Sequence, residues 1–105
     1  MAQTWIIAIN KVDNPPAGQP QAEFVPNPQT VAAGDIIYWR NNDDAPHWPA
    51  PNAQAETDWM DYQIPAKLQG QPAPTSQQAV SFAAAGTYNY VCALHPDETG
   101  TITAT

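Results

Sequence analysis

Twelve prolines in 105 residues are the feature that most limits how this chain can fold. Proline lacks a backbone donor and breaks the interior of a helix, and no long stretch of the sequence repeats apolar residues at helical spacing. Short segments rich in β-branched and aromatic residues alternate with turn-forming residues instead, as at 4–10 and 36–40. The sequence therefore predicts an all-β chain of about seven short strands, a pattern typical of a β-sandwich.

The expected strands are residues 4–10, 24–25, 30–31, 36–40, 79–83, 87–92 and 100–105. Ala33-Gly34-Asp35 predicts a turn between two of them. Residues 41–75 contain six prolines and show no clear pattern. Because a structureless loop of this length is unusual in a compact domain, we expect short strands or a helical turn inside it, around residues 56–62. Four aromatic residues are predicted to lie in the core: Trp5, Trp39, Tyr88 and Tyr90.

Length and charge narrow the classes of function. A chain of 105 residues suits one domain, residues 1–105, and the 43% apolar content argues against disorder. A net charge of −7 speaks against nucleic acid, since phosphate binding needs clustered lysine and arginine. The acidic surface either favours solubility alone or attracts a basic protein partner. The longest apolar run, residues 5–9, is too short to span a bilayer.

The single cysteine and the two histidines are the residues most able to carry chemistry. Cys92 ends a predicted strand, and His95 follows three residues later across a tight loop. His47 follows the predicted strand at 36–40, and it can reach Cys92 because loops at one end of a sandwich converge. Two imidazoles and one thiolate in a trigonal array suit copper with a weak axial fourth ligand. Zinc can occupy the same ligands, and each residue taken alone more often has an ordinary structural role.

Two segments of the sequence resemble the ligand regions of the cupredoxins, in the branch of plastocyanin and amicyanin. The first reads Phe24-x-Pro26, Val31-x2-Gly34-Asp35 and Trp39-x-Asn41-x4-Pro46-His47, and the second reads Gly86-x-Tyr88-x-Tyr90-x-Cys92-x2-His95-Pro96-x3-Gly100. This resemblance covers most of the chain. It implies an eight-stranded Greek-key sandwich, one-electron transfer, and one copper ion with His47, Cys92 and His95 as equatorial ligands.

The same resemblance implies a periplasmic or otherwise extracytoplasmic protein. The sequence has no basic start leading into an apolar stretch, which fits either a mature form without its signal peptide or a cytoplasmic protein, and the resemblance favours the mature form. Redox proteins are the expected partners, and acidic residues are expected to steer basic ones toward the chain: Asp43, Asp44, Asp58 and Asp61. We expect a monomer, although the sequence does not fix the oligomeric state.

Position 98 departs from the family pattern. In the short-loop cupredoxins the residue three after the loop histidine is the axial methionine, and here it is Glu98. A carboxylate is a harder, charged ligand that stabilises Cu(II) over Cu(I), so we expect axial ligation by Glu98 to lower the reduction potential. Two alternatives stay open. Glu98 points to water and leaves the axial position empty or filled by a backbone oxygen, or Met60 supplies the axial ligand.

Two further residues near the first ligand are informative. Trp48 stands where many relatives carry a small polar residue that ties the ligand loops together, and we expect it to shield the copper, to form part of a docking surface or to pack over the loop. Asn41 matches a family asparagine and is expected to fix a loop by a hydrogen bond.

The sequence leads to an electron carrier as the first hypothesis. Electrons would pass through His95, within an apolar rim of Ala93, Leu94 and Pro96. The alternatives are a copper site with an exchangeable position for small-molecule chemistry or sensing, a copper-binding or storage module, and a metal-free interaction domain. We expect no enzyme activity, because the Cys-x2-His spacing fits chelation better than a nucleophile with a distant base.

Overall fold

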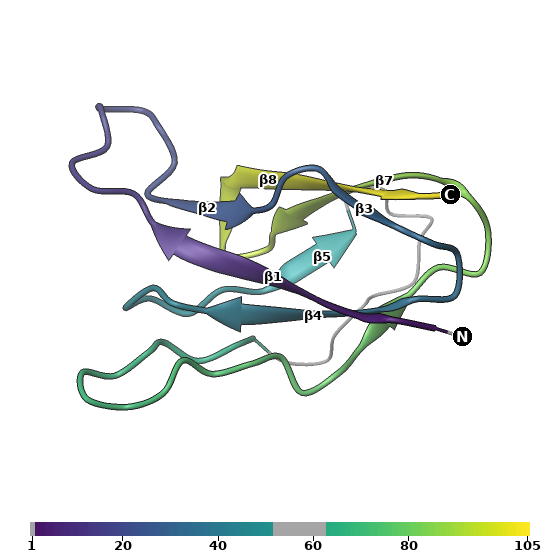
Figure 1. Cartoon of the computed structure of the whole chain (residues 1–105). Coiled ribbons are helices and arrows are strands. Elements are labelled where there is room, and N and C mark those ends of the chain that lie inside the picture. Colours follow the sequence, from purple (N-terminus) through teal and green to yellow (C-terminus); the bar gives the residue numbers. More distant parts are fainter. Residues whose placement is uncertain (1, 52–62) are drawn as a thin grey trace.

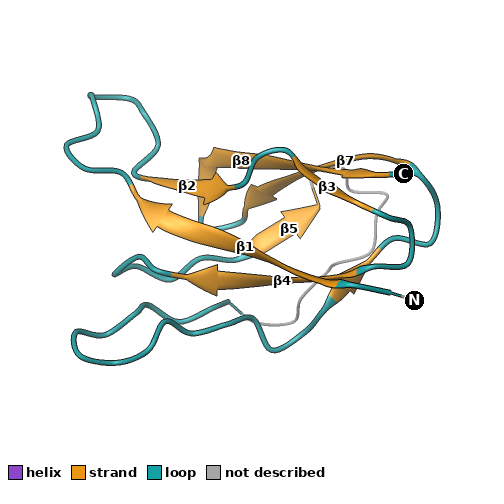
Figure 2. Ribbon diagram, viewed as in Figure 1, coloured by secondary structure: helices purple, strands orange, loops and turns teal. Residues whose placement is uncertain are grey.

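The computed structural model describes residues 2–51 and 63–105, which form eight strands and no helix (Figures 1 and 2). The strands are β1 (Thr4–Lys11), β2 (Ala22–Val25), β3 (Gln29–Val31), β4 (Ile36–Asn41), β5 (Pro49–Pro51), β6 (Val80–Ser81), β7 (Gly86–Cys92) and β8 (His95–Ala104). The prediction of an all-β chain is therefore confirmed. A search of the same residues for a helix able to cross a membrane finds none.

The strands form two four-stranded mixed sheets that face each other, as Figure 1 shows. One sheet has the order β2-β1-β4-β6, with β1 and β4 parallel and the other pairs antiparallel. The second has the order β3-β8-β7-β5, with β3 and β8 parallel. Strands that are neighbours in sequence thus often lie in different sheets, which is the arrangement expected for a Greek-key sandwich.

The core lies between the sheets, and strand periodicity explains how it forms. Alternate residues of a strand point to opposite faces, so β1 buries Ile7 and Ile9. In the same way β4 buries Ile37 and Trp39, as the alternation of the sequence predicts. Tyr90 of β7 is fully buried, and the rings of Phe24 and Trp39 contact it edge to face at centroid distances of 4.8 and 5.4 Å. Trp5 and Tyr88, by contrast, are only partly buried against this core.

One turn and two strands can be compared directly with the predictions from the sequence. The predicted turn at residues 33–35 is present, and Gly34 adopts a φ of 91° that favours glycine. The proline-rich stretch contributes the short strand β5, whereas the helical turn expected around residues 56–62 lies outside the described residues. The last strand begins at His95 rather than at residue 100. This earlier start determines the direction in which Glu98 points.

Candidate metal centre

Two backbone hydrogen bonds with Ile64 hold His47 in place. Its N–H donates to the carbonyl of Ile64 at 3.1 Å, and the N–H of Ile64 donates back at 2.7 Å. The loop between β4 and His47 is fixed by Asn41, whose Nδ2 donates to the carbonyls of Ala45 and Pro65 at 2.8 and 3.0 Å. The expectation that Asn41 supplies a loop-fixing hydrogen bond is confirmed. His47 itself is 1% exposed.

Cys92 and His95 lie at the junction of β7 and β8. The two strands are joined by a turn of two residues, and the register shifts by a bulge between Val91 and Cys92 so that Cys92 pairs with His95. Cys92 is fully buried, while the side chain of His95 is 36% exposed. The neighbours Ala93, Leu94 and Pro96 are exposed, which agrees with the predicted apolar rim.

Glu98 points inward because of its place in β8. Residues 98, 100, 102 and 104 share one face of the strand, and all four are buried. Ile102 and Ala104 contribute to the core, so the same alternation brings the Glu98 side chain into the interior with 3% exposure. The alternative in which Glu98 points to water is therefore wrong. Met60, the other proposed axial residue, lies outside the described residues.

The four candidate ligands converge on one point. Nδ1 of His47, Sγ of Cys92, Nδ1 of His95 and a carboxylate oxygen of Glu98 lie within 4.8 Å of one another. The sulfur lies 3.6 Å from Nδ1 of His47 and 3.4 Å from Nδ1 of His95. Oε1 of Glu98 lies 2.9 and 3.4 Å from the same two nitrogens. Residues 45 positions apart are thus brought together at one end of the sandwich.

Asp43 orients the His47 ring. Its Oδ2 lies 2.8 Å from Nε2 of His47, and Asp43 is 5% exposed. A carboxylate at this nitrogen favours a proton on Nε2 and leaves the lone pair of Nδ1 facing Cys92 and Glu98. The expectation that Asp43 steers partners from the surface is wrong. It is also held by its own backbone, whose N–H donates to Oδ1 of Asn41 and whose carbonyl accepts from the N–H of Lys67. No pattern in the sequence reveals these contacts.

Residue 48 links the two ligand loops through its backbone. The N–H of Trp48 lies 3.4 Å from Sγ of Cys92, to which it donates, and its carbonyl accepts from the N–H of Ala93 at 2.8 Å. Main-chain atoms of residue 48 thus connect the two ligand loops. The indole of Trp48 is partly buried and packs against the core.

The electrostatics of the cluster favour a positive charge at its centre. Burial lowers the pKa of His47, but hydrogen bonds with Cys92 and Asp43 and the charge of Glu98 outweigh it and raise the pKa to about 9. Burial raises the pKa of Cys92, but hydrogen bonds from His47, the Trp48 backbone and His95 lower it to about 7. Burial raises the pKa of Glu98 even though both histidines oppose that shift.

These residues fit a metal ion. Among the residues that the structure describes, Oε1 of Glu98 is a buried oxygen without a well-formed hydrogen bond, although two imidazole nitrogens lie 2.9 and 3.4 Å from it. Buried polar atoms without a partner are rare in folded proteins, and a cation would satisfy this one. A set of two imidazoles and one thiolate with a weaker fourth ligand suits copper, and the space between the donors fits one copper ion.

A two-sheet Greek-key sandwich with a His-Cys-His group at one end defines the cupredoxin class. The comparisons agree with this assignment. The model of the copper binding proteins of the plastocyanin/azurin family matches residues 15–105, so the chain belongs to that family. It differs from the usual members in having Glu98 at the position of the axial methionine. A comparison with curated protein sequences finds no match.

Solved structures share the fold at low identity. Amicyanin from Paracoccus versutus is 21% identical, with a TM-score of 0.69, and the alignment covers 97% of this chain and 81% of amicyanin. A purple cupredoxin from Nitrosopumilus maritimus is 22% identical, with a TM-score of 0.64 and full coverage of both chains. Members of this family are mostly electron carriers rather than enzymes, and the family and the candidate ligands support a copper electron-transfer protein.

Proposed function

We propose that this protein is a one-electron carrier that binds one copper ion through His47, Cys92, His95 and Glu98. The observation that carries the proposal is the convergence of these four donor atoms within 4.8 Å of one another. Bound copper would supply the Cu(II)/Cu(I) couple. The chain holds the donors on strands and on loops fixed by backbone bonds, which favours the same ligand arrangement in both oxidation states.

We further propose that electrons and partners reach the centre at the edge where His95 is exposed. His95 is the candidate ligand that reaches the surface, since its side chain is 36% exposed while those of His47 and Glu98 are buried. Leu94 beside it is 39% exposed and offers apolar contact. We place the exchange of electrons at this edge, with basic redox proteins as partners of a monomeric single domain, residues 1–105, located outside the cytoplasm.

Copper titration tests the ligand set. One equivalent of Cu(II) added to the purified chain should produce a strong thiolate-to-copper charge-transfer band in the visible range. Cys92→Ser should abolish this band, and His47→Ala should weaken binding. Asp97→Asn, which changes an exposed neighbour of Glu98, is the matched control and should keep the band. A chain that stays colourless with cupric ion contradicts the proposed site.

Stopped-flow measurements test the carrier role separately. A copper-loaded chain that acts as a carrier should exchange electrons rapidly with itself and with a redox protein of opposite charge. The rate with a basic partner should fall with added salt, because the chain carries a net charge of −7. A coloured protein with slow self-exchange and no reaction with any redox protein would keep the site and remove the carrier function.

A second function is favoured by one observation. A cavity of about 350 Å³ has His47, His95 and Glu98 in its wall, so a small molecule can approach the donor group from this side. A copper site with an exchangeable position for small-molecule chemistry or sensing would use this approach. Azide and nitric oxide are suitable probes, because their binding changes the visible spectrum. An unchanged spectrum at millimolar azide and at saturating nitric oxide excludes this second function.

A further inference from the structure

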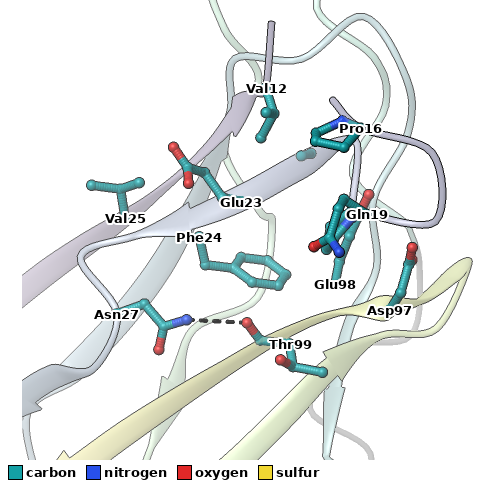
Figure 3. Close-up of a pocket in the computed structure, with 12 residues that line it drawn as sticks. Val12, Pro16, Gln19, Glu23, Phe24, Val25, Asn27, Asp97, Glu98 and Thr99 are labelled. Atoms are coloured by element: carbon teal, nitrogen blue, oxygen red, sulfur yellow. Dashed lines mark hydrogen bonds between the residues drawn. The ribbon is translucent and has the colours of Figure 1, made fainter. Parts of the chain in front are cut away.

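A groove of about 740 Å³ lies beside the candidate metal centre, between the segment 12–25 and the start of β8. We call it the β2–β8 groove. Figure 3 shows the ring of Phe24 pointing into it, with Glu23 on one side and Asp97 on the other. The groove does not include His95, although it shares Glu98 with the metal centre. It is therefore a surface distinct from the proposed electron-transfer edge.

The described charged side chains that line the groove are all acidic. Glu23 and Asp97 are exposed, Glu98 lies buried in the wall, and none of the described residues that line the groove is basic. The nearest lysine along the chain is Lys11. Its Nζ lies 3.2 Å from Oδ2 of Asp44, and neither of these two residues lines the groove. Carboxylates on opposite sides of a concave surface concentrate a negative potential between them. An anionic partner would be repelled from such a groove.

The apolar residues of the lining further restrict which kind of side chain fits the groove. Val12, Pro16 and Val25 supply the apolar surface of the groove, and Val25 is 41% exposed, whereas Phe24 is 3% exposed and its ring forms part of the core beneath it. Long basic side chains place their aliphatic stems on apolar surface and keep the charged head near acidic groups. Arginine suits such a site particularly well because its planar head pairs with carboxylates. The lining therefore matches a basic side chain better than a purely apolar one.

We propose that the β2–β8 groove docks a cationic segment of a protein partner, with a basic side chain between Glu23 and Asp97 and its stem against Val12, Pro16 and Val25. The inference rests on the proposed carrier function only in identifying the partner as a redox protein. A partner seated here would lie next to Glu98 and leave the His95 edge free for electron transfer.

Peptide titration followed by NMR tests the docking directly. The probe is the peptide acetyl-Arg-Leu-Arg-Leu-amide, added to the ¹⁵N-labelled Cu(I)-loaded chain at low salt. Shifts should concentrate on the amides of residues 23–25 and 97–99 and not on residues 93–95. Acetyl-Gln-Leu-Gln-Leu-amide should bind at least about threefold more weakly, since an exposed charge pair contributes a factor of this order.

Single variants distinguish binding of the peptide in the groove from its general attraction to an acidic chain. Glu23→Gln and Asp97→Asn should each lower the affinity for the arginine peptide by about twofold to fivefold. Asp13→Asn is the matched control, because Asp13 is exposed and acidic but does not line the groove. Equal weakening by all three variants, shifts spread over the whole acidic surface, or equal affinity for the glutamine peptide would overturn the proposal. If the chain takes up no copper, the same titration on the metal-free chain still decides about the groove while the carrier function fails.

Discussion

Replacing Glu98 by glutamine removes one negative charge from the candidate metal centre and changes little else in size. Oε1 of Glu98 lies 2.9 Å from one imidazole nitrogen and 3.4 Å from the other, and the side chain is 3% exposed. A unit charge at about 3 Å in an effective dielectric of about 20 contributes about 5 kcal/mol. For one electron this corresponds to about 200 mV, and a twofold larger dielectric still leaves about 100 mV.

The carboxylate stabilises Cu(II) more than Cu(I), so its removal should raise the reduction potential. We expect Glu98→Gln and Glu98→Met to raise it by about 100 to 200 mV at pH 8, as measured by spectroscopic redox titration. When the pH falls far enough to protonate the carboxyl group of Glu98, the potential of the wild-type protein should climb toward that of Glu98→Gln, whereas the glutamine variant should lack this component.

Asp97→Asn is the matched control for the Glu98 variants. Asp97 is the neighbouring acidic residue but is exposed. An exposed charge contributes at most about 1 kcal/mol, or about 40 mV. If Glu98→Gln shifts the potential no further than Asp97→Asn, while both variants bind one copper ion and keep their circular dichroism, Glu98 does not act on the copper and the reasoning is refuted.

Three other predictions follow from the described contacts. In the metal-free chain His47 keeps its proton up to a pKa of about 9, so copper ligation must displace that proton, while the Cys92 thiol with a pKa of about 7 is already ionised above pH 7. The apparent affinity for copper, measured by competition with a chelator, should thus rise about tenfold per pH unit from about pH 7 to about pH 9 and level off at higher pH. A flat profile contradicts the raised pKa of His47. Gly100→Ala should lower the free energy of unfolding by about 1 to 3 kcal/mol in urea, because a methyl group there would overlap the buried ring of Tyr90, and an unchanged midpoint would show that the ring moves aside. Asp35 has a lowered pKa through hydrogen bonds from the Gln3 backbone, the Trp5 indole and the Ala32 backbone. The stability it contributes is present above its unfolded pKa and is lost as the pH falls through the lower folded pKa, so Asp35→Asn should have a lower Tm at pH 7 and a flatter loss of Tm in acid.

The strand pattern and the candidate ligands were accessible from the sequence because both depend on local signals. Alternation at Ile7 and Ile9 reports a buried strand face directly. The spacing of Cys92 and His95 places two donors across one tight turn whatever the rest of the chain does. Sequence reasoning needed only the general convergence of sandwich loops to add His47.

Asp43 was not accessible in this way. A carboxylate between Asn42 and Asp44 looks like part of a solvated loop, and its burial depends on contacts with the His47 ring and with the distant backbone N–H of Lys67. The backbone link at Trp48 was hidden for a related reason. Main-chain hydrogen bonds depend on the path of the chain and leave no mark on side-chain identity, so the sequence directed attention to the indole instead.

The early start of β8 changes how Glu98 is understood. Had the strand begun at residue 100, Glu98 would belong to a loop, and a loop carboxylate can turn away from the metal at small cost. Its pairing with β7 instead places Thr99 opposite Val91 and Gly100 opposite Tyr90, which fixes the backbone on the C-terminal side of Glu98. The side chain then has only its own rotamers with which to adjust its reach. A shorter acid such as aspartate cannot follow the same path, so the length of the side chain matters at this position as well as its charge.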